Sequence, residues 1–359
     1  MSLHGLLLQS FRCHQQLTLT FSPAVTLILG SNAVGKTSIV EALSLLSTGE
    51  SFRAEHDEDM VQFGKEIGRV KTKLSGEDGD ELEIDITRGL LQGKVVQKKH
   101  YLLNGAKKRK KDFVGHFTTV VFRPEDMRLI EGSPTRRRQF IDVLLCAAHP
   151  AYAVSLSTYE GALKRRNRLI DSVQSGEMSK TVLTYWTSLL LKHGTVVQEF
   201  RRQFFQGCDG AQFPLQFEVT YDPSVVSEAR FTEYADKEIA AGHTLIGPHK
   251  DDFIVKFLSA AGSGVTLSPD WIDVSQFGSR GQQRLAVLWL KLNELHYLEK
   301  LQGARPVLLL DDILSELDHE HRVQVDELLK HGQTIITTTE PAVIADITAL
   351  IPNLQVVQL

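Results

Sequence analysis

The chain has 359 residues, of which 42% are apolar and 23% charged, and this composition is typical of a globular protein rather than a disordered one. Its 40 basic and 44 acidic residues give a net charge of −4, so binding to a nucleic acid would depend on local basic clusters. Three isolated cysteines and the lack of a long apolar run argue against a disulfide framework, secretion and membrane spanning, and predict a cytoplasmic protein.

A strand, a glycine-rich loop and a helix follow one another near the start of the chain. Apolar alternation over 17–21 predicts a half-buried strand, the apolar run 25–29 predicts a second strand, and a helical pattern begins at Lys36. Glycines let successive N–H groups point into one concavity, and a helix N-terminus favours an anion. The sequence therefore predicts a loop that binds the phosphates of a nucleoside triphosphate. Its residues are Gly30, Ser31, Asn32, Ala33, Val34, Gly35, Lys36, Thr37 and Ser38.

Basic residues gather in one segment that contains no acidic residue between its ends. The segment also holds Asn104-Gly105 after an apolar stretch, which predicts a tight hairpin. A hairpin with basic flanks can lie along a phosphate backbone without reading its sequence, although a solvated basic surface explains the same pattern. The predicted DNA-binding residues are Lys98, Lys99, Lys107, Lys108, Arg109, Lys110 and Lys111. The clusters 136–138 and 164–168 are second choices, for which helix-surface solvation or internal ion pairs are favoured.

The middle of the chain changes character. Residues 138–146, 152–172 and 180–204 show helical periodicity without sustained heptads, which predicts a compact helical arm. We therefore expect three segments: residues 1–127 as the N-terminal lobe of an α/β head, 128–209 as an inserted arm, and 210–359 as the C-terminal lobe.

Residues 275–284, in which Ser279-Arg280-Gly281-Gln282 precedes a long helical stretch, resemble an ABC-type signature motif. Small residues before a helix N-terminus form a second anion site, with Ser279 as the cap. Lys36 and its loop already occupy one side of the nucleotide. The second site is therefore expected to serve the nucleotide of a second copy across a two-fold interface, with Ser279, Arg280, Gly281 and Gln282 as further nucleotide ligands.

The run 307–310 followed by two acids resembles a Walker B strand. Asp311 is predicted to hold Mg²⁺ together with the Thr37 hydroxyl, while Asp312, on the opposite face of the strand end, is predicted to polarise the attacking water. With Lys36 and Ser279, these acids make up the predicted catalytic set. The two motifs lie near opposite ends of the chain, so we expect one sheet assembled from both ends.

Residues 315–318 match the spacing of a D-loop, and a strand over 334–339 follows. ABC-type enzymes carry a switch histidine at the end of this strand, and this chain has none there. Either Thr338, Thr339 or Glu340 substitutes for it, or the switch is weaker. The missing histidine and the shorter acid at Asp312 both predict slow hydrolysis.

Together these motifs resemble the RecF family of ABC-type ATPases, which are related to the structural-maintenance-of-chromosomes proteins. The resemblance extends to Phe11-Arg12, 51–53, 122–126, 132–142 and 247–252, where Lys250 replaces the usual arginine. It implies that Arg12 contacts the nucleotide. It also implies ATP-dependent homodimerisation on double-stranded or gapped DNA, slow DNA-stimulated ATP hydrolysis, and work with RecR and RecO in loading recombinase. A transporter ATPase subunit and a scaffold that binds ATP without hydrolysing it are the alternatives.

Overall fold

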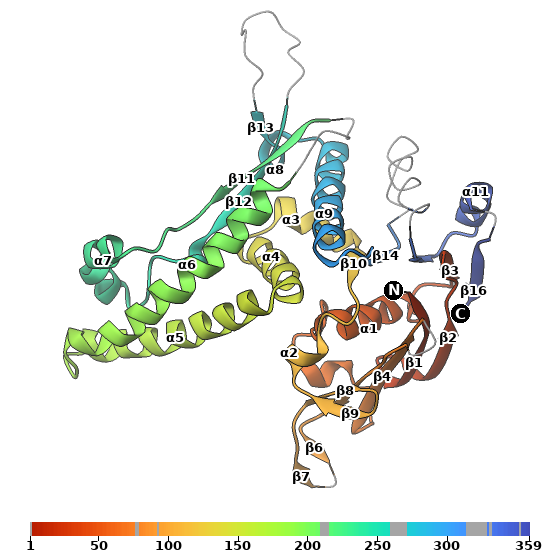
Figure 1. Ribbon diagram of the computed structural model, residues 1–359, viewed down its shortest axis with the longest axis horizontal. Coiled ribbons are helices and arrows are strands. Elements are labelled where there is room, and N and C mark those ends of the chain that lie inside the picture. Colours follow the sequence, from red (N-terminus) through yellow and green to blue (C-terminus); the bar gives the residue numbers. More distant parts are fainter. Residues whose placement is uncertain are drawn as a thin grey trace, which may run out of the picture. The chain divides into compact units, whose positions relative to one another are not determined.

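The computed structural model describes residues 2–75, 79–91, 93–208, 215–258, 271–313, 329, 332–351 and 353–359 (Figure 1). The chain forms two compact units, Met1–Asp126 with Glu294–Leu359, and Met127–Asn293. The first unit thus combines both ends of the chain, as predicted. The boundary expected after residue 127 lies beside the boundary between the units, but residues 210–293 belong to the second unit. The finer division into two lobes and an arm stays a prediction.

The first unit contains a six-stranded antiparallel sheet in the order β2-β1-β4-β5-β8-β9. Its strands are β1 (Leu3–Phe11), β2 (His14–Thr20), β4 (Ile67–Leu74), β5 (Glu81–Thr87), β8 (Lys99–Leu103) and β9 (Ala106–Lys108). The predicted hairpin at its edge is confirmed. Asn104 and Gly105 have φ angles of 50° and 76°, the left-handed pair that a type I′ turn requires.

A five-stranded parallel sheet in the order β10-β14-β15-β3-β16 forms the second layer of this unit. Its strands are β3 (Val25–Leu29), β10 (Thr119–Phe122), β14 (Val307–Asp311), β15 (Thr334–Thr338) and β16 (Gln355–Gln358). Strands β14 and β15 are buried along their whole length, as expected for strands covered on both faces. Strands from both ends of the chain are neighbours in this sheet, with β10 beside β14 and β3 between β15 and β16.

Helix α1 (Lys36–Thr48) contacts β10, β14 and β15 of the parallel sheet and β1, β4 and β5 of the antiparallel sheet. This position between two sheets explains why its apolar residues are not confined to one stripe. Ile39, Leu43 and Leu46 are buried in the core that the two sheets share with the helix. The helix ends at Gly49, whose φ of 71° lets its N–H bond to the carbonyl of Leu45.

Short elements complete the part of the first unit that the structure describes. They are η1 (Asp57–Met60), β6 (Leu90–Leu91), β7 (Lys94–Val95), α2 (Lys110–Phe113), η2 (Pro124–Met127) and α11 (Ala342–Leu350).

The second unit is mainly helical and contains a small antiparallel sheet, β11-β12-β13. Its helices are α3 (Arg128–Glu131), α4 (Pro134–Ala148), α5 (Pro150–Gln174), η3 (Lys180–Leu183), α6 (Thr184–Gln206), α7 (Glu228–Ala241), η4 (Pro248–Lys250), α8 (Val274–Phe277) and α9 (Arg280–Gln302), in which the boundary with the first unit falls. Its strands are β11 (Phe217–Asp222), β12 (Asp252–Leu258) and β13 (Trp271–Asp273). The long helices α5 and α6 pack along each other (Figure 1). The three predicted helical stretches are confirmed, whereas α7 and β12 lay outside the prediction.

Buried ion pairs hold the helices of the second unit together. Arg166 of α5 pairs with Glu238 of α7 at 2.6 Å, so this member of the second-choice basic cluster has a structural role. Arg201 of α6 pairs with Asp142 at 2.7 Å and with Asp251 at 2.8 Å. None of the described helices is both long and apolar enough to cross a membrane.

Candidate nucleotide-binding site

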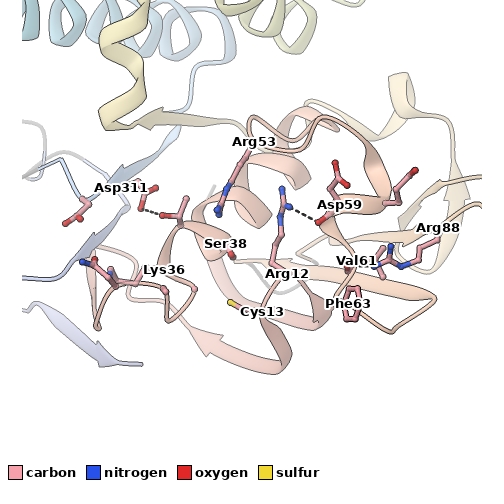
Figure 2. A pocket seen from close by; sticks show the side chains of 16 residues that line it. Arg12, Cys13, Lys36, Ser38, Arg53, Asp59, Val61, Phe63, Arg88 and Asp311 are labelled. Carbon is pink, nitrogen blue, oxygen red and sulfur yellow. Dashed lines mark hydrogen bonds between the residues drawn. The ribbon is translucent and has the colours of Figure 1, made fainter.

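A pocket of about 670 Å³ opens in the first unit where β3 and β14 end (Figure 2). It brings together most of the residues that the sequence placed in the phosphate loop and the Walker B strand. From these two motifs it is lined by Asn32, Ala33, Gly35, Lys36, Thr37, Ser38, Asp311 and Asp312. Residues from opposite ends of the chain therefore form one site, as predicted.

The phosphate loop has the tight path that its glycines predict. Gly35 has a φ of 108°, and a Cβ atom there would lie 2.3 Å from Nε2 of His14 and 2.6 Å from Sγ of Cys13. A side chain at position 35 would therefore force the side chains of Cys13 and His14 to move. Ala33 has a φ of 64°, an uncommon conformation for a residue with a Cβ and one that often marks functional loops.

The Lys36 ammonium lies inside the loop that carries it. Its Nζ donates to the carbonyl oxygens of Gly30 at 2.8 Å and Ser31 at 2.9 Å. These two carbonyls hold the charge at the centre of the loop. A phosphate bound by the loop N–H groups would meet this cation.

Thr37 and Asp311 supply the oxygens that a magnesium ion would need. Thr37 Oγ1 donates to Asp311 Oδ1 at 3.2 Å. Two neighbouring ligands in an octahedral magnesium site lie about 3 Å apart, since each is about 2.1 Å from the metal. A hydroxyl and a carboxylate at this spacing, with phosphate oxygens and water as further ligands, fit Mg²⁺.

The two acids of the Walker B motif line the same pocket. Strand β14 ends at Asp311, and Asp312 adopts a φ of 53°, so the chain leaves the strand at this point. The orientation of Asp312 toward the opposite face of the strand end stays a prediction. Burial raises the pKa of Asp311, and hydrogen bonds from Thr337 and Thr37 oppose that rise.

Arg12, which the resemblance assigned to the nucleotide, lines the pocket but is tied to α1. Its Nε and Nη2 donate to the two carboxylate oxygens of Glu41 at 2.9 and 2.6 Å, and its Nη1 donates to the carbonyl of Asp59 at 2.7 Å. Three of its five N–H groups are thus used within the unit. Glu41 also accepts a hydrogen bond from Ser51.

The other end of the pocket carries groups that the sequence did not assign to the site. Phe63 and Arg88 line it, and Arg53 lies between them and Asp311 (Figure 2). Phe63 is 97% exposed, although Arg88 fixes its loop by donating to the carbonyls of Val61 at 3.1 Å and Lys65 at 2.9 Å. An exposed aromatic ring on an anchored loop is a stacking surface for a base. Phe63 is distinguished by the exposure of its ring, and that exposure cannot be predicted from the sequence.

The signature segment lies in the second unit and forms an N-terminal capping box. Ser279 Oγ accepts from the N–H of Gln282 at 3.3 Å, and the Gln282 side chain accepts from the N–H of Ser279 at 2.8 Å. Because the Ser279 hydroxyl is an acceptor here, its proton is left to donate to another group. Arg280 pairs with Glu131 at 2.6 Å. A site shared between two copies stays a prediction, and residues 315–318 lie outside the described residues.

Ion pairs involve four of the seven residues predicted to bind DNA. Their partners are Glu58 for Lys98, Asp57 and Glu50 for Lys99, Asp112 for Arg109, and Glu50 for Lys110. Lys107, Lys108 and Lys111 are exposed and make no ion pair with any residue that the structure describes. The basic segment is therefore partly neutralised by its own surroundings.

Comparison with known proteins agrees with this geometry. The RecF/RecN/SMC N terminal domain family matches residues 2–356. The DNA replication and repair protein RecF of Geobacillus kaustophilus (strain HTA426) is 33% identical over 364 residues, which cover 94% of this chain and 93% of that protein. The chain belongs to the RecF family. A second RecF, from Bacillus cytotoxicus, is 32% identical over 357 residues, 92% of this chain and 90% of its own length.

Solved structures place the fold in the same family. The recombination mediator protein RecF-ATP of the RecFOR pathway matches with a TM-score of 0.82 and 28% identity, and covers 95% of this chain and 92% of its own. An Smc head domain from Pyrococcus furiosus matches with a TM-score of 0.51 at 17% identity, covering 96% of this chain and 91% of that chain, which shows the fold alone. The fold is thus an ABC-type ATPase head of the RecF and SMC kind, as predicted.

Proposed function

We propose that this protein is an ATP-dependent DNA-binding switch of recombinational repair. The observation that carries the proposal is the hydrogen bond between Thr37 and Asp311, which joins the two nucleotide motifs across the first unit. A relative of the same fold is described as RecF-ATP in the RecFOR pathway. The relatives named for DNA replication and repair favour this function over a transporter subunit.

The pocket has a phosphate end and a base end. The triphosphate binds at the loop N–H groups and Lys36, the Arg53 guanidinium adds positive charge, and the base stacks on Phe63. Bound Mg²⁺, held by Thr37 and Asp311, would neutralise charge on the β- and γ-phosphates. Asp312 takes a proton from the water that attacks the γ-phosphorus as the bond to the β-phosphate breaks and ADP leaves. The missing switch histidine fits slow turnover, and stimulation of that turnover by DNA is what the family resemblance implies.

ATP drives dimerisation through the signature segment. The Ser279 hydroxyl of one copy donates to the γ-phosphate held by the other copy, so the interface exists only while that phosphate is present. The closed dimer binds double-stranded or gapped DNA, with Lys107, Lys108 and Lys111 as the cations that need not give up an ion pair first. RecR and RecO are the partners that the family implies for recombinase loading.

Sedimentation with and without ATP and a DNA duplex tests the switch. Wild-type protein is expected to dimerise only with ATP, and Asp312→Asn is expected to stay dimeric because it binds ATP without turning it over. Ser279→Arg is expected to bind ATP as a monomer, whereas Ser157→Arg, at an exposed position of α5, serves as the matched control. ATP-dependent dimers of Ser279→Arg equal to those of the control would overturn the shared site. If no phosphate is released either with or without DNA, the result would instead support a scaffold that binds ATP without hydrolysing it.

A further inference from the structure

Thr337 lies between the two nucleotide motifs, at the centre of the parallel sheet. Strand β15 separates β14 from β3, and Thr337 pairs in register with Asp311 on one side and Ile28 on the other. Neighbouring residues in register on parallel strands point to the same face of a sheet. The Thr337 side chain therefore shares a face with the Asp311 carboxylate, and it is fully buried.

The Thr337 hydroxyl touches both acids of the site. It donates to Asp311 Oδ1 at 2.7 Å and accepts from the backbone N–H of Asp312 at 3.2 Å. The carbonyl of Thr337 also accepts from that N–H, at 3.1 Å. One side chain thus orients the Asp311 carboxylate and supports the left-handed turn at Asp312, a conformation that costs free energy unless its surroundings hold it.

We propose that Thr337 is a positioning residue that presents the Asp311 carboxylate to the metal of the nucleotide. The inference rests on the proposed function, because it concerns the same metal site. Thr37 and Thr337 both donate to Oδ1 of Asp311. When Thr37 and Asp311 both ligate Mg²⁺, the bond between them is replaced by bonds to the metal, and Thr337 becomes the group that keeps the carboxylate in place. Partners of this kind behind a metal ligand contribute about 10- to 100-fold in metal affinity.

The test is the Mg²⁺ concentration at which a fluorescent ATP analogue reaches half of its metal-dependent binding, measured with full-length protein. Thr337→Val keeps the shape and burial of the side chain but removes the hydroxyl, and is expected to raise this midpoint about 10- to 100-fold. Binding of the same analogue in EDTA is expected to stay unchanged, because the loop N–H groups and Lys36 are untouched. Thr337→Ser retains the hydroxyl and is expected to restore the midpoint.

Thr334→Val is the matched control. Thr334 lies at the other end of β15, is also buried, and pairs in register with Leu308 and Val25 rather than with a residue of the site. An unchanged midpoint in Thr337→Val, or an equal shift in Thr334→Val, would overturn the positioning role. Wild-type protein that shows no metal-dependent binding at all would overturn the proposed function as well, so the two failures are distinguishable.

Discussion

Arg12 is a residue at which a structural role can be separated from a nucleotide-binding role. The Glu41 side chain that it pairs with is fully buried, and the Arg12 side chain is 17% exposed. We predict that Arg12→Met lowers the free energy of unfolding of the first unit by about 3 kcal/mol. This is the low end of the range for breaking a buried pair. We choose this low value because the Arg12 guanidinium is partly exposed to solvent in the wild-type protein, and because the Ser51 hydroxyl still donates to the Glu41 carboxylate in the variant.

The assay must report on the first unit by itself. Trp186, Trp271 and Trp289, the three tryptophans of the chain, all lie within Met127–Asn293, so tryptophan fluorescence follows the second unit only. Hydrogen exchange of the amides of α1, measured by mass spectrometry, follows the first unit. Faster exchange in α1 with an unchanged fluorescence transition is the expected result. Wild-type exchange rates in Arg12→Met would refute the assignment of a buried ion pair.

A double variant then distinguishes the two roles. Adding Glu41→Gln to Arg12→Met removes the buried negative charge and is expected to recover most of the lost stability. If Arg12 supports ATP binding only through its ion pair with Glu41, the double variant recovers ATP binding together with stability. If the remaining N–H groups of Arg12 contact the phosphates, ATP binding stays weak in a stable protein. The family resemblance predicts the second result.

Three further predictions follow from exposure and charge. Cys13 is the exposed cysteine of the pocket, so ATP at ten times its Kd should slow maleimide labelling of Cys13 about tenfold in wild-type protein and leave the rate unchanged in Lys36→Ala, as peptide mapping would show. Alanine at Lys107, Lys108 and Lys111 together should lower the slope of log affinity for duplex DNA against log salt by about 2.7, or about 0.9 for each phosphate contact, and an unchanged slope would exclude these lysines from the interface. Burial lowers the pKa of His249 from 6.5 to about 4, so between these pH values the unfolded chain binds a proton that the folded protein excludes. The contribution of His249 to the free energy of unfolding is therefore complete above pH 6.5 and falls as the pH drops toward 4. Urea unfolding of His249→Gln should lose that part of the pH dependence.

The sequence predicted the parts of the site whose chemistry is local. A glycine-rich loop between a strand and a helix, and two acids at the end of an apolar strand, have few other readings, and Lys36, Thr37 and Asp311 lie where this pattern placed them. The sequence did not assign Thr337 to the site because no pattern in its own segment distinguishes it from other strand residues. The residue acts through its neighbour in the sheet, and strand order depends on contacts between distant segments.

Charge was the least predictable property. The basic segment lacks acidic residues in the sequence, yet Glu50, Asp57 and Glu58 approach it in space and pair with its lysines. Arg166 is buried against Glu238, which is the internal ion pair that was one of the two interpretations favoured for its cluster. A run of like charge in a sequence predicts a binding surface only if the fold brings no opposite charge to it.

The nucleotide site exists only when both ends of the chain have joined one sheet. Thr37 follows β3, while Asp311 and Thr337 belong to β14 and β15, so no single segment offers both a phosphate loop and a metal carboxylate. A ligand that binds only the assembled site must stabilise the pairing of these strands. Residues Met127–Asn293, which lie between β3 and β14 in the sequence, form a unit with its own core and its own buried ion pairs. If the proposed function holds, ATP would therefore stabilise the first unit by holding together strands that come from both ends of the chain.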